Sequence, residues 1–189
     1  GGSYGLDGMV RSPVGRTPGW IGYSLAWSDR QFDELNGGRR FPSRYDNRHK
    51  LNIVVMHKLS KRVELSAAWT YTSGNYTTLS TESYEGLTPP SKDPFYNFRQ
   101  EQFDLYGDRN NYRLPAYHRL DLGINIYRPK KKGRMGIWNV SVYNAYCRMN
   151  PFMIEKTDEY NPDERKSYPV FKQYSFLPIV PSITYTYKF

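Results

Sequence analysis

The side chains that could perform chemistry lack the spacing of a catalytic or metal site. The chain has three histidines without ligand spacing, His49, His57 and His118. Glu101, Asp104 and Asp108 form an acidic cluster that could bind a hard cation, but they match no ordered calcium-loop signature. There is no Gly-x-Ser-x-Gly motif, no phosphate-binding glycine loop and only one cysteine, Cys147. We therefore expect neither an enzyme nor a bound cofactor or metal.

The residues best suited to gripping a small ligand are aromatic and basic, and they gather between residues 74 and 115. An aromatic ring can stack on a ligand, while a guanidinium pairs with its carboxylate or phosphate groups. The candidates for substrate contact are Tyr96, Arg99, Arg109, Tyr112 and Arg113. Packing of one loop on another is an equally weighted explanation for the same side chains.

A second basic cluster precedes this segment. Its arginines are Arg39, Arg40, Arg44 and Arg48, and they are interleaved with Phe41 and Tyr45. The formal net charge of the 189-residue chain is +9. Such a surface attracts polyanions, either a nucleic acid or the phosphates of a membrane.

The elements that position these residues are strands, because the dominant period of the sequence is two. Apolar and polar side chains alternate through residues 20–29, 63–73, 117–128, 135–148 and 182–189. Residues 49–59 are noisier, since Val54 and Met56 interrupt the polar face, and residues 4–10 form a weaker strand. We predict an all-β chain of about seven strands with no convincing helix.

The connections predict how the strands are arranged. Short segments at 12–18, 60–62 and 129–134 alternate with longer ones at 30–48, 74–115 and 155–168. An antiparallel up-and-down meander in a membrane sorts its connections in this way, with turns on one side and loops on the other. No run reaches the roughly 18 apolar residues of a membrane helix, and mean hydropathy is −0.78, but alternating barrel strands average out polar.

Aromatic residues lie near the strand ends. They are Trp20, Tyr23, Trp27, Trp69, Tyr71, Tyr127, Trp138, Tyr143, Tyr185 and Tyr187. Tyrosine and tryptophan form girdles where headgroups meet hydrocarbon. The simpler explanation, that aromatic residues favour strands, is weaker because the sorting of the loops supports a membrane independently.

Several stretches resemble the C-terminal barrel of TonB-dependent outer-membrane receptors, particularly those of Bacteroidetes. They are 19–28 (GWIGYSLAWS), 35–38 (LNGG), 45–49 (YDNRH), 69–75 (WTYTSGN), 109–121 (RNNYRLPAYHRLD), 142–146 (VYNAY), 150–152 (NPF) and 177–189 (LPIVPSITYTYKF). The resemblance covers nearly the whole chain, and the stretches 109–121 and 177–189 are its most specific parts.

The resemblance implies a barrel of about 22 strands with a plug and a TonB-contacting segment. Neither plug nor TonB segment is recognisable, and the chain begins Gly1-Gly2-Ser3 without Met, so we expect residues 1–189 to supply the last seven strands of a longer receptor. The implied function is import of a scarce nutrient (siderophore-iron, cobalamin or a glycan) across the outer membrane of a Gram-negative bacterium. The basic cluster would then face lipopolysaccharide phosphates, which we rank well above nucleic acid.

The resemblance also gives the last strand a role. Ile183, Tyr185, Tyr187 and Phe189 share one face, like the terminal signal that the barrel assembly machinery reads in this family. An edge strand with alternating apolar side chains is suited to recognition by strand addition.

Two alternatives remain open at the level of sequence. One is a small outer-membrane barrel, alone or completed by several subunits, with an adhesive or structural role. The other is a soluble β-sandwich that binds carbohydrate or nucleic acid.

Overall fold

The computed structural model describes residues 1–87 and 100–189. In that part of the chain it contains strands and two short 3-10 turns, with no α-helix and no helix able to cross a membrane. The chain forms two compact units. Unit 1 comprises Gly1–Gly2, Ser28–Asp46 and Tyr76–Leu114, and unit 2 comprises Ser3–Trp27, Asn47–Asn75 and Pro115–Phe189.

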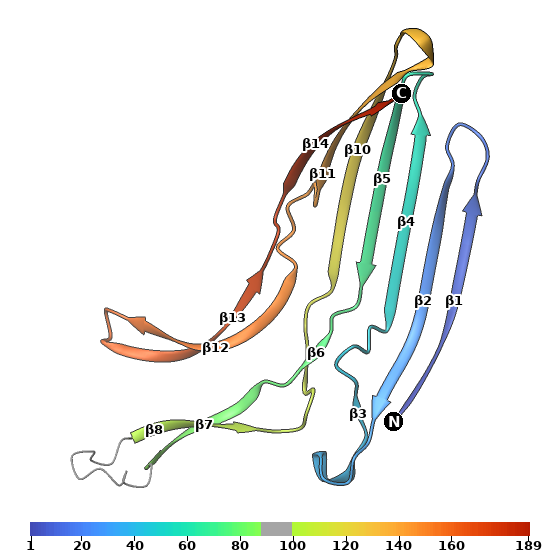
Figure 1. Cartoon of the computed structure of the whole chain (residues 1–189). Coiled ribbons are helices and arrows are strands. Elements are labelled where there is room, and N and C mark those ends of the chain that lie inside the picture. Colours follow the sequence, from blue (N-terminus) through green and yellow to red (C-terminus); the bar gives the residue numbers. More distant parts are fainter. Residues whose placement is uncertain (88–99) are drawn as a thin grey trace. The chain divides into compact units, whose positions relative to one another are not determined.

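The main sheet is an up-and-down meander whose long strands neighbour one another in chain order (Figure 1). They are β1 (Gly2–Ser12), β2 (Gly19–Arg30), β4 (His49–Lys58), β5 (Val63–Thr72), β10 (Tyr117–Pro129), β11 (Met135–Tyr143) and β14 (Val180–Lys188). These are the seven strands that the alternation predicts, so the all-β, antiparallel prediction is confirmed. The outermost strands β1 and β14 do not pair with each other in the described residues, and no closed barrel is seen.

Connections of different length lie at opposite ends of this sheet. Residues 13–18, 59–62 and 130–134 link neighbouring strands at one end, and residues 31–48, 73–116 and 144–179 link them at the other. Antiparallel pairing of β2 with β4, β4 with β5, β5 with β10 and β10 with β11 fixes this sorting.

Strand β11 ends earlier than the predicted strand 135–148. Asn144 adopts a left-handed backbone with φ 55° and is 1% exposed. Its side-chain amide donates to the carbonyls of Arg148 (2.9 Å), Leu177 (3.2 Å) and Pro178. Asparagine tolerates this conformation better than β-branched or bulky residues. The alternation of side chains continues past this point in the sequence, but the backbone turns.

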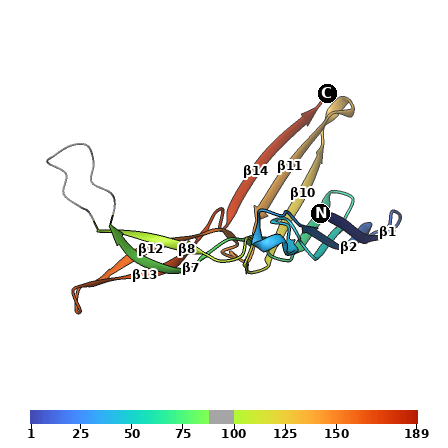
Figure 2. The same ribbon diagram turned by 90° about the horizontal axis from the view of Figure 1, so that it is seen from below.

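The predicted connection 155–168 is largely a hairpin. In the sequence between β11 and β14, strands β12 (Pro151–Asn161) and β13 (Lys166–Ser175) pair antiparallel and form a separate two-stranded sheet. Figure 2 shows this hairpin from below. The hairpin has no apolar face: charged pairs such as Glu155 with Lys172 lie directly opposite each other, so its alternation is hidden. Near its turn, Tyr168 donates a hydrogen bond to Glu164, which raises the pKa of the phenol.

Unit 1 is built mainly from short strands in two of the three longer connections, 31–48 and 73–116. They are β3 (Phe41–Pro42), β6 (Tyr76–Thr77), β7 (Ser80–Leu87), β8 (Gln100–Tyr106) and β9 (Tyr112–Arg113). β6 pairs with β9, β7 pairs with β8, and β3 pairs with the end of β2. The predicted loop 74–115 is therefore ordered in the part that the structure describes.

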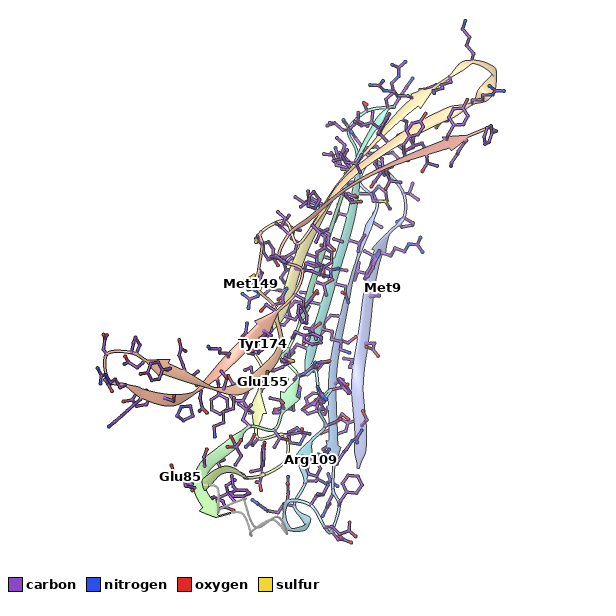
Figure 3. The ribbon with its side chains drawn as sticks, turned by 60° about the vertical axis from the view of Figure 1, so that its left-hand side comes forward. Met9, Glu85, Arg109, Met149, Glu155 and Tyr174 are labelled. Carbon is purple, nitrogen blue, oxygen red and sulfur yellow. The ribbon has the colours of Figure 1, made fainter. Side chains whose placement is uncertain are left out.

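Buried apolar side chains are few. Among the described residues, only Phe41 and Leu114 are buried hydrophobic side chains. A water-soluble domain of this length would bury a sizeable core. The main sheet is instead a single layer, and side chains project from both of its faces (Figure 3).

Candidate functional site

The register of unit 2 collects the apolar side chains on one face of the sheet. Residues directly opposite each other in neighbouring strands point to the same side, so the alternation of each strand continues into the next. Cross-strand pairs on this face include Ile21 with Ile53, Trp69 with Leu120, Leu65 with Ile124, Ile124 with Val140 and Val140 with Ile183. The result is one apolar face that extends from β2 to β14.

No described residue covers this apolar face. Ile21 is 48% exposed, Leu122 44% and Ile183 69%. Leu120, Ile124 and Ile126 are half-buried by their neighbours in the sheet, and none of them lies beneath a second layer. Isolated exposed hydrophobic residues are ordinary, but a contiguous apolar surface over six strands marks contact with a partner or with lipid.

Aromatic rings gather at both ends of the apolar face. Beside the longer connections lie the pairs Tyr4 with Trp27 (ring centroids 5.3 Å apart), Tyr23 with His49 (6.2 Å), Trp69 with Tyr71 (6.1 Å) and His118 with Tyr146 (5.5 Å). Beside the short turns lie Trp138 with Tyr185 (4.7 Å) and Tyr187 with Phe189 (5.1 Å). Aliphatic side chains occupy the middle.

Three predicted girdle residues lie on the opposite face. Trp20 pairs with Val54 and Tyr127 with Ile137, positions that alternate away from the apolar rows. Tyr143 also faces that side, where its ring lies 4.0 Å from the guanidinium carbon of Arg119. The alternation of a strand can be predicted from the sequence, but not whether a given aromatic residue lies on the apolar or the polar face of the sheet.

The polar face carries hydrogen bonds that cross the strands. Asn125 donates to Glu64 (3.4 Å) and accepts from Asn139 (2.7 Å), which joins β5, β10 and β11. Arg119 and Asp121 form an ion pair of 2.8 Å on the same face of β10. Half-buried charges of this kind require water or polar partners in front of them.

Val54 and Met56, which interrupt the predicted polar face, have apolar neighbours. With Met9 of β1 and Trp20 of β2 they line a hollow of about 520 Å³ in unit 2, and Figure 3 marks Met9. The irregularity of residues 49–59 is thus a local apolar patch on an otherwise polar face.

The four residues of the predicted assembly signal lie on β14 or just after it. Ile183, Tyr185 and Tyr187 share the apolar face, and the Tyr185 ring packs against Trp138. Phe189 is 98% exposed. The far edge of β14 pairs with no strand in the described part of the chain, so its backbone groups are open to strand addition.

Unit 1 contains a hollow of about 630 Å³, here called the loop hollow. Its main lining residues are Arg30, Phe32, Phe41, Arg44, Tyr45 and Arg109. The volume falls within the range of small-molecule sites, roughly 300–1,000 Å³. Three guanidinium groups face one lining carboxylate, that of Glu34, which makes the hollow electropositive.

Two asparagines hold the walls of the loop hollow together. Asn36 accepts a hydrogen bond from the backbone amide of Arg109 (2.7 Å) and donates to its carbonyl (3.4 Å). Asn110 donates from its side chain to the carbonyl of Pro42 (2.7 Å) and from its backbone amide to Thr78 Oγ1 (3.0 Å). Both asparagines have positive φ, 54° and 57°. Segments distant in sequence are thus fixed against each other before any ligand arrives.

The predicted substrate residues fall in different places. Arg109, marked in Figure 3, lines the loop hollow. Arg113 stacks on the Tyr76 ring (5.1 Å) and donates to the carbonyl of Asp46 (3.2 Å), while Tyr112 is exposed on β9. The other two predicted residues, Tyr96 and Arg99, lie outside the described residues.

The predicted basic cluster does not stay together. Arg39 pairs with Asp108 (2.6 Å), Arg40 with Asp29 (3.5 Å), and Arg48 lies over the ring of Trp27 (5.0 Å). Only Arg44 lines the loop hollow.

Arg30, Asn36 and Asn110 contribute to the loop hollow, although sequence reasoning did not select them. The two asparagines could have been recognised as turn residues, because Asn36 precedes two glycines and Asn110 precedes Asn111.

The possible metal ligands have other partners. Each histidine forms a hydrogen bond through its Nδ1 atom to a hydroxyl group. The partners are Tyr23 for His49 (2.8 Å), Thr17 for His57 (2.8 Å) and Tyr146 for His118 (2.7 Å). In the acidic cluster, Asp104 accepts from Ser83 (3.0 Å) and Asp108 pairs with Arg39. The described residues contain no group of three ligating side chains.

Comparison of the chain with protein-family models, with curated proteins and with solved structures found no match. Functional assignment therefore depends on the two faces of the sheet and on the loop hollow.

Proposed function

We propose that this chain forms part of the wall of an outer-membrane β-barrel, as the C-terminal segment of a TonB-dependent receptor that imports a scarce nutrient. The observation that carries the proposal is the apolar face that extends from β2 to β14 without a covering layer. The sequence resemblance supplies the family.

Energetics favour lipid as the cover of this face. An exposed Leu or Ile side chain forgoes about 1.5–3 kcal/mol of burial free energy when it is left in water. Ile21, Leu65, Leu122 and Ile183 are each exposed on this face. For these four side chains the forgone free energy is at most about 6–12 kcal/mol, which is comparable with the marginal stability of a typical domain, about 5–15 kcal/mol.

The spacing of the aromatic ends fits a bilayer. From His118, beside the aromatic pairs at the longer connections, to Ile126, opposite Trp138, β10 advances roughly 26 Å at about 3.3 Å per residue. This segment of β10 has nine residues, which matches the roughly 9–11 residues of a tilted membrane-spanning strand. The polar face, with Glu64, Arg119 and Asp121, would line a water-filled interior.

The orientation follows from the C-terminus. In the proposed receptor the short turns and Phe189 face the periplasm, and the longer connections face the medium. Lipid and lipopolysaccharide surround the wall, the assembly machinery recognises β14, and TonB acts through another part of the receptor. The strands β1 and β14 then pair with further strands, because an open edge does not survive in lipid.

Fractionation tests the proposal. The full-length protein, produced in a Gram-negative host, should be recovered with outer membranes and require detergent for extraction. Its electrophoretic mobility should change on boiling, as expected for a folded barrel. Recovery in the aqueous phase without detergent would overturn the proposal and favour a soluble sandwich.

The open edges of the sheet also suit a second candidate, a small barrel that several subunits complete together. Cysteines placed on the outer edges of β1 and β14 distinguish the two. Disulfides between β1 of one copy and β14 of another would favour the oligomer, and the absence of such disulfides under oxidising conditions would favour the receptor.

A further inference from the structure

The loop hollow has a charge pattern that points to its ligand. Among the described residues, its lining contains the guanidinium groups of Arg30, Arg44 and Arg109 and one carboxylate, that of Glu34. A surplus of fixed positive charge in a concave site concentrates anions. The pattern therefore deepens the proposed function, on which its interpretation rests, by indicating the class of nutrient captured at this site.

The three lining arginines differ from others in the same unit. Arg39 and Arg40 form ion pairs with Asp108 and Asp29. Within the described ranges, no carboxylate lies in ion-pair distance of Arg30, Arg44 or Arg109. Their guanidinium groups remain available for bidentate hydrogen bonds to carboxylate or phosphate oxygens.

Aromatic rings accompany these charges. Phe41 is 5% exposed and contacts Phe32, with ring centroids 6.3 Å apart, whereas the ring of Tyr45 is 67% exposed. The buried ring gives the hollow a rigid wall and the exposed rings offer stacking surfaces. The guanidinium carbon of Arg44 lies 5.8 Å from the centroid of the Tyr45 ring, and a charge beside an exposed ring suits a ligand that is itself a ring bearing charges.

The hollow is organised before the ligand arrives. Asn36 bonds both backbone groups of Arg109, and Asn110 joins the turn before β9 to the carbonyl of Pro42. A site whose walls are already fixed loses less conformational entropy on binding.

We infer that the loop hollow binds a small, multiply charged anion built on a ring, with two or more carboxylate or phosphate groups paired to Arg30, Arg44 and Arg109. Its oxygens accept hydrogen bonds from the arginines, and its ring stacks on Tyr45 or Phe32. Such groups could belong to a free solute or to a lipid headgroup.

Calorimetry on the full-length protein in neutral detergent tests this inference, with benzene-1,3,5-tricarboxylate as the probe. The protein should bind the tricarboxylate and not its neutral triamide, and added salt should weaken binding. R109Q and R44Q should each weaken binding about tenfold, through loss of charge-assisted hydrogen bonds. E34Q should tighten binding, because it removes the one carboxylate in the described part of the lining.

Matched controls separate a site from general attraction. R40Q removes the same charge from the same segment outside the lining, and R62Q removes it from a short turn; both should leave affinity unchanged.

Competition identifies the source of the ligand. Displacement of the tricarboxylate by pyrophosphate alone assigns a free solute, and displacement by lipopolysaccharide as well assigns a lipid headgroup. Equal binding of the triamide, no binding at millimolar tricarboxylate, or equal losses in R40Q and R109Q would overturn the inference. A protein that is correctly located in the outer membrane but fails to bind would leave the proposed function standing.

Discussion

Three asparagine residues occupy left-handed backbone positions where this chain departs from regular strand geometry. Asn36, Asn110 and Asn144 all have positive φ, and each uses its side chain to satisfy backbone groups of a distant segment. An asparagine side chain offers two donors and an acceptor, and its short stem tolerates a left-handed backbone. These residues position the loop hollow and the end of β11.

The role of Asn144 can be measured. In N144A the carbonyls of Arg148, Leu177 and Pro178 lose a buried donor, and the left-handed backbone becomes unfavourable. We expect a loss of about 1–3 kcal/mol in the free energy of unfolding, measured by urea titration of the refolded full-length protein. N144G keeps the backbone relaxed and should lose about 1 kcal/mol less. Equal stability of all three proteins would show that the side chain contributes nothing.

Contacts of this kind could not be predicted from the sequence. Asn36 and Arg109 are 73 residues apart, so their pairing depends on the folded arrangement of unit 1. Arg109 was identified because it is a basic residue among the aromatic residues of the segment 74–115. Arg30 was not, because it lies at the start of the connection 30–48, outside both the basic cluster and the segment 74–115.

Strand β10 shows at the scale of elements what alternation can predict. Leu120, Leu122, Ile124 and Ile126 share the apolar face, and the residues between them share the polar one. Seven such strands were predicted because the period of two is a property of the backbone and survives any tertiary context. The hairpin of β12 and β13 was missed because polar and apolar side chains are mixed on both of its faces, so its alternation carries no clear hydrophobic signal.

Substitutions on adjacent residues of β10 test the assignment of its faces. I124R places a charge at the middle of the apolar face and should cost about 2–4 kcal/mol or block assembly. N125R should be mild, since the new guanidinium lies across from Glu64 on the polar face. The measurement is the yield of folded, heat-modifiable protein in outer membranes. Equal tolerance of both substitutions would contradict the assigned faces.

At the scale of the whole molecule, the main sheet is an open one. It has one exposed apolar face and two unpaired edges in the described residues. Edges of this kind are aggregation sites in water, and proteins normally protect them. The proposed barrel resolves both features at once, because lipid covers the face and further strands cover the edges.

The end of the chain should matter for assembly as well as for stability. Deletion of Phe189 removes a ring that is 98% exposed and has Tyr187 as an edge-on neighbour. Since it buries little, its loss should scarcely change the stability of refolded protein. Its deletion should lower the amount of the protein in outer membranes several-fold, because the proposed assembly signal ends at this residue. K188A, one residue earlier, is the control. Unchanged membrane levels after the deletion would argue against the assembly signal.

Accessibility along β10 tests the central claim most directly. Spin labels placed one at a time at residues 118–128 of the reconstituted full-length protein, in a Cys147→Ser background, report contact with lipid through collisions with oxygen and contact with water through collisions with a nickel chelate. The account predicts oxygen maxima at Leu120, Leu122, Ile124 and Ile126, with nickel maxima at the positions between them. Low accessibility of the Leu and Ile positions to both reagents would reveal a covering protein layer and contradict the membrane assignment.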